Sequence, residues 1–137
     1  GRDAAQGRRG TERILLVEDE EGLRTMIHHT LTRWGYTVLE AKNAGEALLL
    51  CEQSKERIDL LLADVVMPLL RGSQLAARLK ELQPTLKVLL MTGYVDDLEA
   101  ELAQSRADDL LLKPFSADVL TDRIRNVLDC GSPEMAT

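Results

Sequence analysis

Apolar residues along the chain follow two alternating spacings from residue 14 to residue 128. Short continuous apolar runs are typical of strands buried on both faces, and apolar residues three and four positions apart are typical of helices with one buried face. The continuous runs predict strands at 14–17, 36–39, 58–63, 86–91 and 110–112. The helical spacing predicts helices at 23–34, 43–51, 75–82, 98–102 and 117–128. The chain therefore repeats a strand followed by a helix five times.

Turn and capping residues support these boundaries. Gly35 directly follows the first helical pattern and is a stop signal. Asn43 and Glu46 have the spacing of a capping box at the start of the second helix. Ser116 is placed to cap the last helix, and Gly131 lies just past its end. The signals at the ends of the helices therefore agree with the apolar periodicity.

A repeated strand–helix order predicts one parallel sheet covered by helices on both faces, which is a doubly wound α/β fold. We predict that one domain spans residues 12–129. Residues 1–11 are rich in Gly and Arg and lack apolar periodicity, so we expect a disordered linker or a remnant of preparation. The first residue is Gly rather than Met, so we expect a trimmed N-terminus. Residues 130–137 are predicted to be a polar tail.

Composition and charge exclude several classes of function. The longest purely apolar runs are far shorter than the roughly 20 residues that a membrane span needs, and no secretory signal is visible. The net charge is −6, and the basic residues form no cluster outside the first thirteen residues, so direct nucleic-acid binding is not expected. Cys51 and Cys130 lie far apart, which favours two unpaired thiols in a reducing cytoplasm.

Polar residues that could bind a ligand or react directly follow four of the predicted strands. Glu18 and Asp19 come after the first strand, Asp64 after the third, Thr92 after the fourth and Lys113 after the fifth. The carboxyl ends of parallel strands lie at one edge of the sheet, where ligands bind in folds of this class. Adjacent carboxylates repel one another and need a compensating cation, and an all-oxygen ligand set favours Mg²⁺. We therefore predict a magnesium site at this edge.

The same residues suggest chemistry on a phosphoryl group. Asp64 has the central position, and a carboxylate nucleophile can form an aspartyl phosphate. The Thr92 hydroxyl and the Lys113 ammonium group are expected to contact the phosphoryl oxygens. Gly93 would leave room for that group to approach.

Four segments in this order resemble the receiver domain of two-component response regulators. They are ILLVEDE at 14–20, LLLADVVMP at 60–68 with Gly72 eight residues after Asp64, LLMTGY at 89–94 and LLKPF at 111–115. The resemblance extends from about Arg13 to Leu128. The sequence motifs DVVMP and MTGY are most similar to those of receivers in hybrid sensor histidine kinases. It implies a flavodoxin-like three-layer sandwich with a five-stranded sheet of order 2-1-3-4-5 and five helices.

The resemblance also implies roles for the acidic residues. Asp64 is expected to accept a phosphoryl group from a phosphohistidine on a histidine kinase or a phosphotransfer domain. Asp19 would bind Mg²⁺ directly, Glu18 would bind it through water, and the backbone carbonyl of Val66 would complete the ligand set. Glu18 stands where the family more commonly has Asp. As a phosphoacceptor, the domain is expected to phosphorylate and dephosphorylate itself, and whether it counts as an enzyme is left open.

Signal output is implied to use the face formed by the fourth helix, the fifth strand and the fifth helix. Thr92 and Lys113 would move toward the phosphoryl group, and the Lys113–Pro114 peptide bond is expected to be cis. Leu110 replaces the aromatic residue that the family often has three positions before the lysine, so an aromatic switch is not expected. Nine residues follow Leu128, so we expect the output to be a partner protein, an upstream domain or a phosphorelay.

Two alternative functions stay open. A Mg²⁺-dependent phosphohydrolase acting through an aspartyl phosphate would need a second acid two residues after its nucleophile, where this chain has Val66. A pseudo-receiver that only binds partners would be expected to lack the acidic pair, Asp64 or Lys113, and none is missing. His28 and His29 lie on the first predicted helix and are interpreted as ordinary surface or packing residues.

Overall fold

The computed structural model describes residues 10–67, 70–93 and 107–130. Its centre is a five-stranded parallel sheet of order β2-β1-β3-β4-β5, which confirms the predicted fold and strand order. The strands are β1 (Arg13–Val17), β2 (Thr37–Ala41), β3 (Leu60–Asp64), β4 (Lys87–Thr92) and β5 (Asp109–Leu112). Each strand lies within two residues of the run that predicted it, and the start of β3 differs by two, since its pairing begins at Leu60 rather than Ile58.

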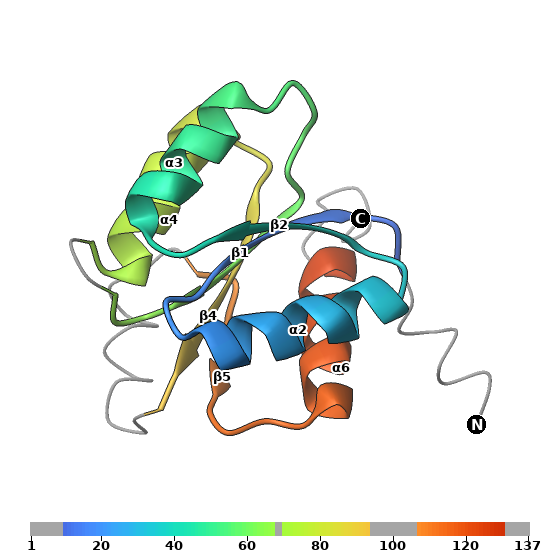
Figure 1. Ribbon diagram of the computed structural model, residues 1–137. Helices are drawn as coiled ribbons and strands as arrows, with labels where there is room; N and C mark the ends of the chain where they lie inside the picture. Colours follow the sequence, from blue (N-terminus) through green and yellow to red (C-terminus); the bar gives the residue numbers. More distant parts are fainter. Residues whose placement is uncertain (1–9, 68–69, 94–106, 131–137) are drawn as a thin grey trace.

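Helices cover both faces of the sheet, as Figure 1 shows. The helices among the described residues are α2 (Glu21–Arg33), α3 (Ala44–Gln53), α4 (Gly72–Leu82) and α6 (Ala117–Asp129). Helices α3 and α4 lie on one face, and α2 and α6 lie on the other, which gives the three layers. The helix predicted at 98–102 falls in 94–106, outside the described residues, as do Pro68, Tyr94 and the chain ends at 1–9 and 131–137.

The core consists of two aliphatic clusters separated by the sheet. Leu15 and Leu61 point toward the α3–α4 side, and their neighbours Leu16 and Leu62 point toward the α2–α6 side. Because β1, β3 and β4 are buried on both faces, their sequences are continuously apolar. Cys51 is a free thiol buried in the first cluster.

Strand β2 shows why an edge strand is harder to predict. The apolar run ended at Leu39, but pairing with β1 continues to Ala41, which pairs with Val17. Glu40 interrupts the apolar pattern because β2 has only one neighbouring strand, so its residues are partly exposed. Tyr36, predicted to begin the strand, precedes it and is buried.

The predicted helix caps are confirmed. Asn43 Oδ1 accepts a hydrogen bond of 2.8 Å from the backbone N–H of Glu46, and Ser116 Oγ accepts one of 3.1 Å from Val119. The Glu46 carboxylate accepts from the N–H of Lys42, one residue before the cap, at 2.8 Å. None of the described helices has the length and apolar character that crossing a membrane requires.

An ion pair at the amino-terminal edge of the sheet joins the start of β1 to α6. Arg125 donates to both carboxylate oxygens of Glu12, at 3.1 and 2.6 Å, and also to Tyr36 Oη at 3.3 Å. The hydrogen bond from Arg125 is the main reason that the pKa of Glu12 is below its ordinary value of 4.5. The pair therefore stabilises the fold above that value and loses its effect as the pH falls through the lower folded pKa.

We expect Glu12→Gln to lower the free energy of unfolding at pH 7 by about 1 kcal/mol, because the charge-assisted pair is lost. The difference from the wild type should shrink as the pH falls below 4.5, where the wild-type carboxylate also becomes protonated. Thermal melts at pH 7 and at successively lower pH values measure both effects. Glu56→Gln is the matched control, since Glu56 pairs with Arg13 in a mostly exposed position. Equal losses in both variants would contradict the prediction.

Candidate functional site

The carboxyl ends of the strands bring together all the side chains that the sequence placed there. Val17 pairs with Ala63 across β1 and β3, so the next residues, Glu18 and Asp64, lie level with each other. A pocket of about 440 Å³ opens at this edge. It is lined by Glu18, Asp19, Glu20, Asp64, Val66, Met91, Thr92, Gly93 and Lys113. The predicted site residues therefore share one pocket, although they are separated by up to 95 positions in the sequence.

Lys113 is the cation between the two buried acids of this pocket. Its Nζ lies 2.5 Å from Asp64 Oδ1 and 3.2 Å from Glu18 Oε1. Glu18 is 1% exposed and Asp64 is 6% exposed, whereas Asp19 is exposed. Among the described residues that line the pocket, Lys113 is the one cation beside the four acids Glu18, Asp19, Glu20 and Asp64, so the site has an excess of negative charge.

The three carboxylates form a group that could hold a metal ion. Glu18, Asp19 and Asp64 each offer one carboxylate oxygen, and these oxygens lie within 4.8 Å of one another. An all-oxygen set with space for water fits Mg²⁺ better than a softer metal. Val66 also lines the pocket and is 56% exposed.

The environment changes the proton affinity of two of these groups. Burial, followed by the nearby Asp64 carboxylate, raises the pKa of Glu18 above its ordinary value. Burial alone would lower the pKa of Lys113, but its hydrogen bond to Asp64 and the charges of Asp64 and Glu18 outweigh burial and raise it. Lys113 therefore stays charged at neutral pH, and burial makes the ionised form of Glu18 less favourable than it is in water.

The strand ends are held by backbone contacts around the pocket. The N–H of Lys113 donates to the carbonyl of Thr92 at 2.7 Å, which joins the ends of β5 and β4. The Lys113–Pro114 peptide bond is cis, as the resemblance implied. Thr92 is 3% exposed, and Leu110, the residue in the usual aromatic position, is buried against the α3–α4 side of the core.

Two residues of this region have contacts that the sequence patterns did not indicate. Gly72 starts α4 directly beneath β3, where a Cβ atom would lie 2.3 Å from the backbone oxygen of Asp64. Arg24 on α2 is 8% exposed and donates to the backbone carbonyl of Glu18 at 2.8 Å. The only signal for Arg24 in the sequence is a charged residue beside the apolar face of a helix.

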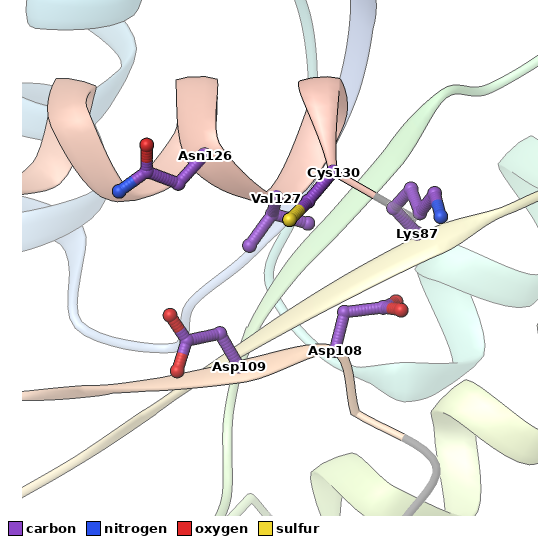
Figure 2. A pocket seen from close by; sticks show the side chains of 6 residues that line it. All are labelled: Lys87, Asp108, Asp109, Asn126, Val127 and Cys130. Carbon is purple, nitrogen blue, oxygen red and sulfur yellow. The ribbon is translucent and has the colours of Figure 1, made fainter. Parts of the chain in front are cut away.

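A second pocket, of about 270 Å³, lies at the opposite edge of the sheet (Figure 2). It is formed by the starts of β4 and β5 and by the end of α6. Its lining residues are Lys87, Asp108, Asp109, Asn126, Val127 and Cys130. The Asp108 carboxylate accepts from the N–H of Val88 at 2.7 Å, so this acid is used to hold β4. None of the predicted site residues lies there.

Comparison with known proteins agrees with this geometry. The family described as "Response regulator receiver domain" matches residues 14–125, which include every predicted site residue. The chain belongs to this family. The receiver domain is 31% identical over 122 residues to "Sporulation initiation phosphotransferase F" of Bacillus subtilis, covering 88% of this chain and 97% of that protein. It is thus homologous to phosphorylatable regulators of two-component systems.

Other relatives place similar domains in different proteins. The receiver domain is 35% identical over 121 residues to "Sensor kinase CckA" of Brucella abortus, covering 88% of this chain but only 13% of that protein. It spans about half of "Transcriptional regulatory protein AfsQ1" of Streptomyces coelicolor, 53% of its length. Among solved structures, the chemotaxis response regulator CheY4 of Vibrio cholerae matches with a TM-score of 0.76 and 30% identity, covering 87% of this chain and 100% of that one.

Proposed function

We propose that Asp64 is the phosphoacceptor of this receiver domain and takes its phosphoryl group from a phosphohistidine of a histidine kinase or phosphotransfer domain. The observation that carries this proposal is the contact of Lys113 Nζ with both Asp64 and Glu18 in one pocket. A carboxylate oxygen of Asp64 forms a bond to phosphorus as the P–N bond breaks. The electron pair of the broken bond stays on the imidazole nitrogen, which takes up a proton. A small acyl phosphate serves as an alternative donor.

The surrounding residues would bind the phosphoryl group. Lys113 Nζ would pair with a phosphoryl oxygen in place of Asp64 Oδ1, and the Thr92 hydroxyl would donate to a second oxygen. Glu18, Asp19, Asp64 and the backbone carbonyl of Val66 would hold Mg²⁺. The ion, when bound, neutralises charge on the phosphoryl oxygens. The crowding of the carboxylates in this pocket supports both parts of the proposal.

Phosphorylation would replace one negative charge with a group of about two, next to Thr92 and Lys113. Thr92 ends β4 and Lys113 directly follows β5, so the added charge would favour one conformation of β5 and α6. We propose that a downstream protein binds this face. The acidic net charge of −6 argues against direct binding to nucleic acid. The function also implies a cytoplasmic location, where histidine kinases obtain ATP.

Two arrangements of the whole protein fit this function. Similarity to Sensor kinase CckA favours the C-terminal receiver of a hybrid histidine kinase, whereas similarity to Sporulation initiation phosphotransferase F favours a free-standing regulator. The choice between a hybrid kinase and a free-standing regulator stays a prediction, which the sequence of the whole protein would test.

One experiment separates the proposed function from its two alternatives. The chain is incubated with a small acyl phosphate and Mg²⁺, and its mass and the release of inorganic phosphate are followed. A stable gain of one phosphoryl group supports the phosphoacceptor. Rapid multiple turnover would indicate a phosphohydrolase, and no modification would indicate a pseudo-receiver.

Metal binding gives a separate prediction. Millimolar Mg²⁺ should raise the melting temperature of the wild type relative to EDTA, because the ion binds the folded acidic pocket. In EDTA, Asp64→Asn should melt higher than the wild type, because it removes a carboxylate charge that, together with burial, makes the ionised form of Glu18 unfavourable. Lys113 keeps Glu18 as its partner in that variant. Coincident melts in EDTA and Mg²⁺, with no gain in the variant, would contradict the predicted repulsion.

A further inference from the structure

We propose that Arg24 is a positioning residue that holds the Glu18–Asp19 pair in place for the metal ion, an inference that rests on the proposed function. Arg24 is the fourth residue of α2 and is 8% exposed. Its Nη1 donates to the backbone carbonyl of Glu18 at 2.8 Å, and its Nε donates to Glu40 Oε1 at 3.1 Å. One guanidinium group therefore joins α2, the loop after β1 and the edge strand β2.

These contacts close a ring around the peptide units of Glu18. The N–H of Glu18 donates to the carbonyl of Ala41 at 3.1 Å, and Ala41 directly follows Glu40. The carbonyl of Glu18 is held by Arg24, which Glu40 holds in turn. Both sides of Glu18 are thus tied to β2. The direction in which Glu18 and the following Asp19 leave the strand is fixed by these bonds.

The side chain of Glu18 is fixed separately. Its Oε2 accepts from the N–H of Glu20 at 3.0 Å, and its Oε1 accepts from Lys113 at 3.2 Å. Contacts of this kind hold the carboxylate only while the backbone beneath it stays in place. Loss of Arg24 would free the carbonyl side of Glu18, and Asp19, which is exposed, would gain the most freedom.

An arginine is specifically suited to this position. Its rigid planar group directs separate donors at two acceptors, which the single ammonium group of a lysine cannot match. Burying a guanidinium group costs free energy that an apolar residue at the same place would avoid. Arg24 is followed on the same face of α2 by Ile27 and Leu31, which are fully buried. The buried charge is therefore better explained by the loop it holds than by the packing of the helix.

Replacing a residue that hydrogen-bonds to a metal ligand typically changes metal affinity by 10- to 100-fold. We therefore expect Arg24→Met to raise the Mg²⁺ dissociation constant about tenfold. Arg24→Lys should recover part of the loss, because an ammonium group can reach one of the two acceptors. Calorimetric titration of the whole chain with Mg²⁺ measures these constants, and circular dichroism checks the fold.

A matched control separates positioning from general stability. His28 Nδ1 lies 2.7 Å from Glu40 Oε2, so His28→Ala removes a second side-chain contact of Glu40 and leaves the hydrogen bonds of Arg24 to Glu40 and Glu18 in place. This variant should bind Mg²⁺ as the wild type does. Glu40→Ala removes the anchor of Arg24 at a partly exposed position and should weaken binding. If Arg24→Met does not fold, this variant decides the question.

A second readout uses phosphorylation. With a small acyl phosphate as donor, Arg24→Met should need about tenfold more Mg²⁺ for its half-maximal rate and should reach the wild-type rate at saturation. A structural role alone would lower the maximal rate instead. Wild-type Mg²⁺ affinity in a folded Arg24→Met, equal losses in Arg24→Met and His28→Ala, or unchanged binding in Glu40→Ala would each overturn the proposal.

Failure of the proposed function looks different from failure of this inference. A wild type that binds Mg²⁺ but takes up no phosphoryl group would disprove the phosphoacceptor, while weaker Mg²⁺ binding by Arg24→Met would still support positioning. A wild type that is phosphorylated, beside an Arg24→Met variant with unchanged Mg²⁺ binding, would leave the function standing and reject the positioning role.

Discussion

Asp64→Asn is expected to abolish stable phosphoryl incorporation from a small acyl phosphate. The amide that replaces the carboxylate is a poor nucleophile. Among the described carboxylates of the pocket, Asp64 makes the closest contact with Lys113, 2.5 Å against 3.2 Å for Glu18. The fold should be kept, because Asn has nearly the same shape and can still accept a hydrogen bond from Lys113. Intact-mass measurement after incubation with donor and Mg²⁺ gives the result directly.

Asp109→Asn is the matched control for this prediction. Asp109 begins β5 at the opposite edge of the sheet, beside the second pocket (Figure 2). Its replacement should leave the mass gain of the wild type unchanged. Undiminished labelling of Asp64→Asn would show that the phosphoryl group resides elsewhere, and equal losses in both variants would point to a general effect on the fold.

Gly72→Ala is expected to destabilise the domain by about 1–3 kcal/mol, the usual cost of adding an atom to a closely packed site. The new Cβ would lie 2.3 Å from the backbone oxygen of Asp64 and 3.1 Å from Leu90 Cδ2. Because the closest atom belongs to the backbone, either α4 or the end of β3 must move. The N–H of Gly72 also donates to the carbonyl of Val65 at 2.8 Å, so movement would reach the residue that follows Asp64.

The same substitution should slow phosphorylation, because the shift is at the backbone of Asp64 itself. Chemical denaturation measures the stability, and the rate of mass gain measures the reaction. Gly22→Ala is the control: a Cβ there meets nothing within 4 Å, and Ala in place of Gly in a helix should stabilise the protein by up to about 1 kcal/mol. A Gly72→Ala variant as stable and as reactive as the wild type would show that the contact is easily relieved.

The fold could be predicted largely because burial leaves a direct trace in the sequence. Strands β1, β3 and β4 are buried on both faces, so each contains an unbroken run of apolar residues. At β2 the trace fails at Glu40, whose strand pairing depends on β1 rather than on its own polarity. Pairing between distant segments is a tertiary property, so the run of apolar residues underestimated this strand.

Some features of the site could likewise be predicted from the sequence, and others could not. The meeting of Glu18, Asp64 and Lys113 was predictable, because parallel strands end at one edge and these residues directly follow apolar runs. The closest contact of Lys113 with an acid, and the raised pKa of the buried Glu18, depended on distances and burial that the sequence spacing does not contain.

From sequence alone, periodicity determined the doubly wound architecture, and the polar residues after each strand determined which edge carries the chemistry. Only the tertiary structure decided that Gly72 lies against the backbone of Asp64 and that Arg24 reaches across from α2 to Glu18. The physical reason is that apolar burial is repeated along the chain and so leaves a pattern. A single close contact or a single buried guanidinium group occurs once and depends on how the layers pack.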